Sequence, residues 1–451
     1  MSSRTQVTSL PITPIYSQSS PNEAIDFDSI KVRFTTNSGL HDETAAVGMS
    51  FLPDAQLKFT LSLEGKSPLF GLRLFDEIGD GKSIEIPARG VAFEAFCSSA
   101  NGTELTLIPR RSVVDAFPAS NEITSATFHL LNFPNFSGPD DCVLVKGNPP
   151  QSWQRCGLVV LAACGWKITI AAIAQTDDHS KSLKTQGGYA ITHVGKIERD
   201  DGTKFSSDRL ADVVECLHYF LSFACGRWSA PAFIVGTNAN GETVFERWGM
   251  GNNSDGAWSG TSSWFDSHHG ELLSEVFPGF LALWQQPVWR TPIAHALYWY
   301  LGACDRRTGV GVDTGLILAQ TALELLAWTV CVEDRRITPP AKFGPHGLSA
   351  AAKLQLLTAT LKISTDIPPN CPVLISGLGQ KWIDSAEAIT RIRNSLVHPS
   401  IKTVMPDGSY FEAWNLSLWY VDMVFLRLCG HSGNYANRLS KRWAGAVEPV
   451  P

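Results

Sequence analysis

The stretch RNSLVHPS, which runs from Arg393 to Ser400, brings together side chains that can do chemistry. An arginine can bind an anionic group through two hydrogen bonds and can stabilise developing negative charge. His398 can accept or donate a proton near neutral pH, because the unperturbed pKa of histidine is about 6.5. Asn394 can orient the histidine or bind the same anion. Arg393, Asn394 and His398 are therefore the candidate catalytic residues.

The spacing of these residues is not diagnostic by itself, since Arg290 and His295 are separated in a similar way. Helix geometry discriminates better. At about 100° per residue, Arg393 falls within the apolar stripe of its helix, whereas Arg391 falls on the opposite face. A guanidinium in an apolar interface is costly without an anionic partner. The pattern favours an anion at Arg393, with a buried ion pair or a side chain that extends to the surface as the structural alternative.

Pro399 determines where His398 lies. On a continuous helix, His398 would face about 140° away from Arg393. The residue before a proline is driven out of the helical region, so the helix is predicted to end at Val397. His398 is then free to turn back beside Arg393, which makes sense of the motif at a helix end.

The first half of the chain is predicted to be rich in β-strands. Residues 1–25 contain many Ser, Thr and Pro and are expected to be mobile. From 26 to 205, short alternating runs such as KVRFTT and KITIAAIA are separated by turn residues, which favours an antiparallel sandwich or barrel. The apolar stretch 156–174 is interrupted by Gly165 and Lys167, and we interpret it as two buried strands rather than a membrane span.

Helical periodicity begins after residue 205. A helix is predicted over 208–225, ending at Gly226, within a mixed connecting region that covers 206–299. Helices then dominate from 300 to 451. Helix starts are predicted at Thr291 with Pro292 in the first position, at Asp313 and at Ser349, and the last helix is predicted to stop at Gly430. The fold class is therefore α+β and multidomain, with an antiparallel β-rich N-terminal domain followed by an all-α bundle.

The composition is that of a globular protein, with 44% hydrophobic and 18% charged residues. The net charge of −6 argues against a protein that coats nucleic acid over its whole surface. Residues 305–442 nevertheless carry 15 Lys and Arg against 11 Asp and Glu, which hints at an anionic ligand near the candidate residues. The ten cysteines form no CxxC pair, and the N-terminus lacks a signal peptide, so a cytoplasmic protein with reduced thiols is expected.

Three other patterns are interpreted as structural. The sequence GDGKS at 79–83 lacks the first glycine and the following helix of a P-loop, and it predicts a turn. The sequences DDH at 177–179 and DSHH at 266–269 have no partner at helical spacing and are predicted to lie in polar loops. No metal or other cofactor is expected.

RNSLVH resembles the Arg-Asn-x-x-x-His signature of HEPN domains, small all-helical bundles of which many are metal-independent endoribonucleases. ILAQTALELLAWTV resembles the family's early helix with its internal glutamate, here Glu324, and AAKLQLLTATL resembles the next helix. WNLSLWYVDMVFLRLCGHSGNYANRL resembles the closing helix and its Gly-x-Tyr-x-x-Arg-like tail. The resemblance covers about residues 300–443. More loosely, HYFLSFACGRW and the β-rich front half resemble large bacterial HEPN proteins of the ApeA type, which are linked to abortive anti-phage defence.

This resemblance implies an endoribonuclease that acts on cellular RNA such as tRNA. Two HEPN domains pair so that two Arg/His sets face one RNA-binding cleft, which implies a homodimer or higher homo-oligomer. Arg393 would bind the scissile phosphate, His398 would act in acid–base catalysis with Asn394 beside it, and Glu324 would hold Arg393 from behind. The β-rich part would sense a phage-derived trigger or restrain the nuclease, and no membrane is involved.

Two other functions are open on the sequence. A HEPN-like bundle can be a non-catalytic dimerisation or nucleotide-binding module, which predicts that Arg393 and His398 are closed over by packing. The 14 Trp residues could instead belong to a carbohydrate-binding or carbohydrate-active protein, which for hydrolysis needs two carboxylates in a groove. The adjacent Asp76 and Glu77 would point to opposite faces of a strand, which ranks this function last.

Overall fold

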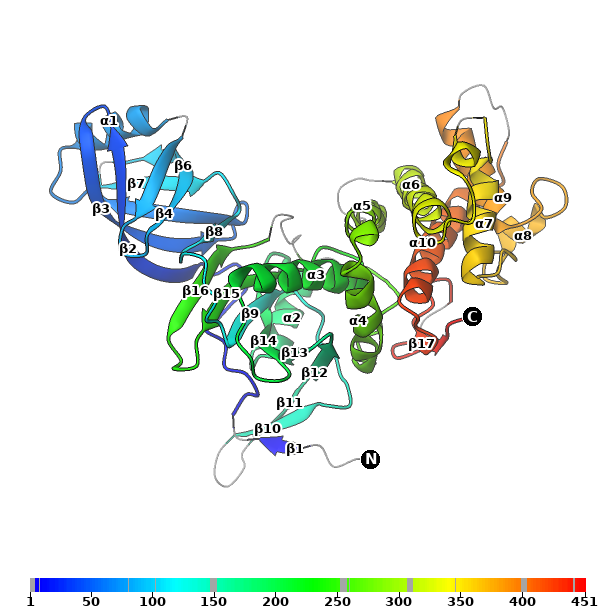
Figure 1. Ribbon diagram of the computed structural model, residues 1–451, viewed down its shortest axis with the longest axis horizontal. Helices are drawn as coiled ribbons and strands as arrows, with labels where there is room; N and C mark the ends of the chain where they lie inside the picture. The colour runs from blue at the N-terminus through cyan, green and yellow to red at the C-terminus, as the bar shows by residue number, and fades with distance from the viewer. Residues whose placement is uncertain are drawn as a thin grey trace.

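The protein has three parts arranged along its long axis (Figure 1). A β-barrel lies at one end, an open sheet lies in the middle, and a group of helices forms the other end. This computed structural model describes residues 5–7, 9–79, 81–101, 103–146, 152–251, 258, 260–305, 311–344, 346–398, 404–440 and 443–451. The antiparallel β-rich N-terminal region and the helical C-terminal region match the predicted α+β class.

The barrel is closed by six antiparallel strands in the order β2-β3-β4-β7-β6-β5. Alternation along the strands places every second side chain in the barrel core, as at Val32 and Phe34, which are almost fully buried. Helix α1 (Pro68–Ile78) packs against β6 and β7 and buries Leu74 and Ile78. The strands are Ile25–Thr36 (β2), Gly39–Ser50 (β3), Gln56–Ser62 (β4), Lys82–Ile86 (β5), Val91–Ala100 (β6) and Glu104–Pro109 (β7).

The middle part is an antiparallel sheet of seven strands in the order β12-β13-β14-β9-β15-β16-β8. Helices α3 (Ser207–Cys225) and α4 (Glu271–Trp284) pack on it, and α2 (Thr176–Gln186) packs against β14. The strands are Val113–Asp115 (β8), Ser125–Leu131 (β9), Leu158–Ala163 (β12), Trp166–Ala172 (β13), Ile191–Arg199 (β14), Pro231–Thr237 (β15) and Thr243–Gly249 (β16). A small sheet joins Thr5–Val7 (β1), Cys142–Lys146 (β10) and Ser152–Cys156 (β11). The two buried strands predicted within 156–174 are confirmed as β12 and β13.

The structure divides the chain differently from the predicted domains. Residues 26–205, predicted as one β-rich domain, are shared between the barrel and the sheet. Strands β15 and β16, from the predicted connecting region 206–299, complete that sheet by pairing with β9 and β8. These pairs join segments about a hundred residues apart, so periodicity within one segment does not reveal them.

The N-terminal segment was expected to be mobile, but part of it is held against the sheet. The backbone N–H groups of Ile15 and Tyr16 both donate to Nε2 of His129, each at 3.1 Å. The hydroxyl of Tyr16 donates to Glu246 at 2.6 Å, and Arg89 of the barrel donates to the same carboxylate at 3.0 Å. This chain of bonds ties the N-terminal segment and the barrel to the sheet.

The C-terminal part is built from helices that enclose the long helix α10 (Figure 1). Helix α6 continues into one π-helical turn, and together 312–334 are long and apolar enough to cross a membrane. However, 61% of the most apolar window is buried inside the protein, as in the core helix of a soluble protein. The helices are Pro287–Cys304 (α5), Val312–Trp328 (α6), Ala350–Leu361 (α7), Pro372–Ser376 (α8), Ser385–Val397 (α9) and Ser409–Leu428 (α10).

Several predicted helix ends are confirmed. Helix α3 stops at Gly226, which is left-handed with φ 64°, and α7 is capped by Ser349, whose hydroxyl accepts from the N–H of Ala352. The prediction at Thr291 is wrong, because α5 already begins at Pro287. The earlier start adds Trp289, which is fully buried, to the apolar face of α5.

Other local predictions need correction for similar reasons. Pro292 lies inside α5 rather than at its first position, and α6 begins at Val312 with Asp313 in its first turn. The residues of DDH at 177–179 lie in helix α2, not in a loop, and His179 is buried with its Nδ1 bonded to a backbone carbonyl. Asp76 and Glu77 lie in helix α1 instead of a strand.

The middle part buries His129 and His193 in the sheet and His218 in helix α3, and their burial predicts a loss of stability in acid. Desolvation lowers the pKa of His129 to about 4, of His193 to about 3 and of His218 to about 4. As the pH falls, the histidines bind protons in the unfolded chain before they do so in the folded protein. The contribution of the neutral histidines to stability is therefore complete above pH 6.5 and is lost as the pH falls towards 4. Each histidine contributes a slope of about 1.4 kcal/mol per pH unit within that window.

The measurement is urea unfolding of the full chain between pH 7.5 and 4.5. The matched variant is His193→Phe, because His193 stacks on Phe136 and its Nε2 has no hydrogen-bond partner among the described residues. In this variant, the slope of the free energy of unfolding against pH is expected to be smaller by about 1.4 kcal/mol per pH unit, the contribution of one histidine. An unchanged slope would show that His193 is not held neutral.

Candidate catalytic site

Helix α9 carries the candidate residues and is strongly capped at its start. The carboxylate of Asp384 accepts from the N–H of Glu387 at 2.8 Å, and the carboxylate of Glu387 accepts from the N–H of Ile383 at 2.7 Å. These reciprocal bonds satisfy backbone groups that a helix start otherwise leaves unpaired. They fix where the helix begins and therefore which residues reach its far end.

The far end of α9 is placed as predicted. The helix stops at Val397, and His398 has an extended backbone with φ −117° and ψ 97°. Its backbone N–H still donates to the carbonyl of Asn394 at 3.0 Å, while its side chain is exposed. The residues that follow, 399–403, lie outside the described part of the chain. His398 is thus released from the helix, as the proline after it predicts.

The two arginines of α9 lie on different faces. Arg391 is exposed and pairs with Glu387 at 2.5 Å, one helical turn away. Arg393 is half-buried, and its Nη1 donates to the side-chain oxygen of Asn394 at 3.2 Å. Among the described residues, no carboxylate forms an ion pair with Arg393, and its buried Nε has no hydrogen-bond partner. No described residue therefore neutralises the guanidinium of Arg393, which leaves it available to bind an anionic ligand.

Glu324 was predicted to support Arg393 from behind. Helix α6, which carries Glu324, packs against α9. The carboxylate of Glu324 accepts from the amide of Gln320 at 3.3 Å. Within the described ranges, no hydrogen bond or ion pair joins Glu324 to Arg393, so the supporting role of Glu324 stays a prediction.

The rival pair Arg290 and His295 has a different environment. Arg290 donates to Asp212 at 3.0 Å and also to Glu215, so its charge is already compensated. His295 lies within helix α5 and is exposed. This pair therefore supplies a matched control for the α9 residues.

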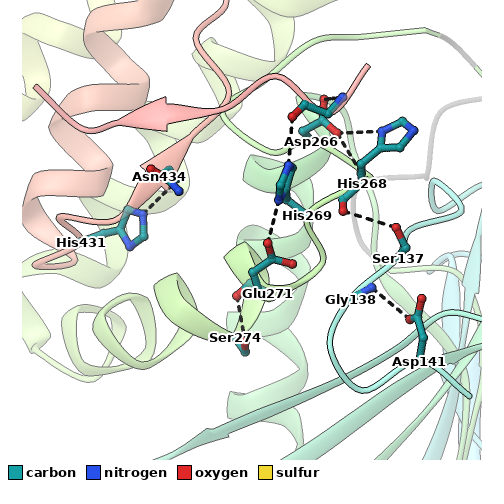
Figure 2. Close-up of polar contacts among 11 residues, drawn as sticks. Ser137, Gly138, Asp141, Asp266, His268, His269, Glu271, Ser274, His431 and Asn434 are labelled. Atoms are coloured by element: carbon teal, nitrogen blue, oxygen red, sulfur yellow. Dashed lines mark hydrogen bonds and ion pairs between the residues drawn. The ribbon is translucent and has the colours of Figure 1, made fainter. Parts of the chain in front are cut away.

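Two residues of the sequence DSHH at 266–269, Asp266 and His269 (Figure 2), bond to Gly445 and form a structural clamp on the C-terminal tail. His269 bonds through Nδ1 to Glu271 at 2.7 Å and through Nε2 to the carbonyl of Gly445 at 3.0 Å. The carboxylate of Asp266 bonds to His268 at 3.0 Å and accepts from the N–H of Gly445 at 3.3 Å. In the described ranges, no group of His, Cys, Asp or Glu residues is arranged to hold a metal ion.

The clamp is expected to depend on pH. Both partners of the His269 ring are acceptors, so both of its nitrogens must carry protons to make both bonds. Burial lowers the pKa of His269, but the bonds to Glu271 and Gly445, with the charges of Glu271 and Asp266, outweigh it and raise the pKa above 6.5. The contribution is fully present below pH 6.5 and is lost as the pH rises through the folded pKa.

Hydrogen exchange of residues 443–451 should therefore be faster at pH 8.5 than at pH 6, after correction for intrinsic rates. The loss of one hydrogen bond corresponds to about a fivefold increase in the equilibrium constant for local opening of the tail, and so in the exchange rate. The variant His269→Gln should abolish the difference, since glutamine does not titrate. Equal corrected rates in the wild type at the two pH values would contradict the clamp.

A buried polar network was missed by reasoning from the sequence. Arg438, in the tail after α10, donates from Nε to Asp422 at 2.6 Å and from Nη2 to the hydroxyl of Tyr300 at 2.6 Å. Tyr300 in turn donates to Asp422 at 2.7 Å. The side chain of Arg438 is only 3% exposed and that of Asp422 is fully buried. An aspartate inside the apolar helix 409–428 is the signal that points to such a partner.

The described geometry can be compared with known proteins. Residues 286–448 match the family described as YopA C-terminal domain. Residues 118–257 match the family described as YopA central domain. The chain is also 26% identical over 405 residues to a protein of Bacillus subtilis (strain 168) described as "SPbeta prophage-derived uncharacterized protein YopA", and the match covers 87% of this chain and 86% of that protein. No solved structure matches the chain.

The YopA matches follow the architecture. The YopA central-domain match covers most of the sheet with α2 and α3, and the YopA C-terminal match covers α5 to α10 with Arg393 and His398. The barrel, residues 25–109, lies outside both family matches.

Proposed function

We propose that this protein is a metal-independent endoribonuclease of the HEPN type that acts in the cytoplasm as a homodimer. The observation that supports it is the end of α9. Arg393 has no carboxylate partner among the described residues, and the exposed His398 follows directly after the helix. A cation that can bind phosphate therefore lies on the last turns of a helix that ends in a proton-transfer group.

The proposed reaction uses the RNA's own 2′-hydroxyl as nucleophile. One histidine takes the proton of that hydroxyl as it attacks the phosphorus, and another protonates the 5′-oxygen as its bond to phosphorus breaks. The products are a 2′,3′-cyclic phosphate and a 5′-hydroxyl. Arg393 binds the phosphate oxygens, and Asn394 accepts a hydrogen bond from Arg393 and so orients its guanidinium.

The need for two proton transfers supports the homodimer. Each chain provides one His398, so a second chain supplies the other proton-transfer group. Two copies of Arg393 in the same cleft also increase the positive potential that RNA requires. The proposed partner is therefore a second copy of this chain, with cellular RNA such as tRNA as the substrate.

The β-rich front half is proposed to restrain the nuclease and to respond to a phage-derived trigger, because uncontrolled cleavage of RNA would harm the host. The B. subtilis relative is described as prophage-derived, which is compatible with a role in phage–host conflict. We propose abortive anti-phage defence as the biological role.

The test is cleavage of total RNA, including tRNA, by the purified full-length protein in EDTA. Wild type is compared with Arg393→Ala and His398→Ala, and with Arg290→Ala and His295→Ala as the matched control pair. Cleavage that is lost only in the first two variants supports the proposal. Cleavage that survives in both would refute the site, and wild-type cleavage that requires a divalent metal would refute the mechanism.

A further inference from the structure

A cavity in the middle part of the protein offers a second candidate site, independent of α9. It has a volume of about 280 Å³ and lies between helix α3 and the β15–β16 end of the sheet. One wall comes from α3 and includes His218 and Tyr219. The other comes from β15, β16 and the residues just after β16, and it includes Phe233 and Gly251. The volume is close to the lower end of the range for small-molecule sites, roughly 300–1,000 Å³.

An irregularity in β15 shapes this cavity. The pairing of β15 with β9 shifts register between Ala232 and Val235. Within that shift, Phe233 adopts a left-handed conformation with φ 51°, which is unfavourable for a bulky residue. The carbonyl of Phe233 accepts from Nδ1 of His129 at 3.1 Å, which holds the strained residue in place. Strain of this kind is characteristic of binding sites and other functional sites.

His218 is a buried polar side chain of the cavity wall. Its ring stacks on Trp228 with centroids 5.2 Å apart and meets Tyr219 edge to face. Nδ1 is the nitrogen on the side of Gly251, since a Cβ placed on Gly251 would lie 3.8 Å from it. Nε2 is enclosed by protein and has no hydrogen-bond partner among the described residues. A neutral imidazole in this position can donate one hydrogen bond to a ligand or accept one from it.

The charged residues of the cavity wall are compensated within the protein. Glu215 is bound by Arg290, and Arg247 is bound by Asp115 at 2.5 Å. A charged ligand would therefore gain no unpaired counter-charge from these two side chains. The remaining wall is mainly apolar, with flat aromatic rings on the α3 side. This environment suits a planar molecule without charge.

We propose that this cavity binds a small, uncharged, planar compound that has either a single ring or two fused rings. The compound would form a hydrogen bond with His218. Val113 and Arg247 line both this cavity and a larger polar cleft of about 1050 Å³ between the barrel and the sheet. A ligand in the cavity therefore contacts residues at the junction of these two parts. The proposal does not depend on ribonuclease activity.

The test measures binding to the full-length protein by ligand-observed NMR. The uncharged probes are indole, benzimidazole and adenine, and the anionic probe is indole-3-carboxylate. His218→Phe keeps a ring against Trp228 but removes the hydrogen bond, and Ala211→Leu fills the cavity from α3. Ala282→Leu on the exposed side of α4 is the matched control.

At least one uncharged probe is expected to bind the wild type and the Ala282→Leu control equally. Its affinity is expected to fall about tenfold in His218→Phe, as for the loss of one hydrogen bond, and further in Ala211→Leu. Ala211→Leu carries the test if His218→Phe does not fold. The proposal is overturned if no uncharged probe binds, if Ala211→Leu binds as the wild type does, or if the anionic probe binds as tightly as indole.

Discussion

Replacing Arg438 by alanine is expected to lower the free energy of unfolding by about 3–5 kcal/mol. Arg438 is enclosed by the fold and provides the only cation bound to Asp422 within the described residues. Its removal leaves a buried carboxylate without a counter-charge and leaves the hydroxyl of Tyr300 without a donor. The penalty is large because a charge in the interior is poorly solvated.

A pair of comparisons separates this charge effect from lost packing. The double variant Arg438→Met/Asp422→Leu should be more stable than Arg438→Met alone, because both charges are then absent. Arg391→Ala is the surface control, since its pair with Glu387 is exposed and should contribute less than about 1 kcal/mol. Urea unfolding followed by tryptophan fluorescence measures the free energy of unfolding of the wild type and of the four variants. A double variant no more stable than Arg438→Met would show that the network acts through shape rather than charge.

Replacing Arg393 or His398 by alanine is expected to reduce RNA cleavage by about 10²–10⁴-fold without a comparable loss of stability. His398 is exposed, and Arg393 makes one side-chain hydrogen bond to the residues that the structure describes, so neither change removes much of the core. Arg393→Lys should lie between wild type and Arg393→Ala, because lysine keeps the charge but cannot bind phosphate through two parallel bonds.

The controls for this prediction are one arginine of α9 and one histidine of α5. Arg391→Ala changes the arginine on the opposite face of α9, and His295→Ala removes an exposed histidine of α5. Both should keep wild-type activity within about twofold, as surface changes usually do. Loss of activity in Arg391→Ala equal to that in Arg393→Ala would show that general charge, rather than the Arg393 position, governs cleavage.

Local features of the fold were predictable from the sequence because their causes are local. Gly226 ends α3 because glycine tolerates the left-handed conformation of a helix C-terminus. Pro399 ends α9 because it excludes the preceding residue from the helix, and Ser349 starts α7 with a side-chain cap. The same reasoning separated Arg393 from Arg391 by helix face.

Other features depend on contacts between distant segments. Barrel closure requires strand β2 to pair with strand β5, and Arg33 and Glu85 lie opposite each other in this backbone pairing. Nothing in the sequence of either strand alone specifies that the two strands meet. Helix α5 begins at Pro287, before the predicted start at Thr291, because the burial of Trp289 outweighs the loss of the backbone hydrogen bond that Pro292 cannot make. The cavity beside His218 arises from the register shift in β15, which no periodic pattern reveals.

The central claim is tested most directly by the chemistry of the RNA ends that the wild-type protein produces in EDTA. The proposed mechanism predicts 2′,3′-cyclic phosphates and 5′-hydroxyls, because the attacking group is the RNA's own 2′-hydroxyl. The same products should be absent with His398→Ala. Ends with 3′-hydroxyls and 5′-phosphates would contradict the account, since they require water as the nucleophile.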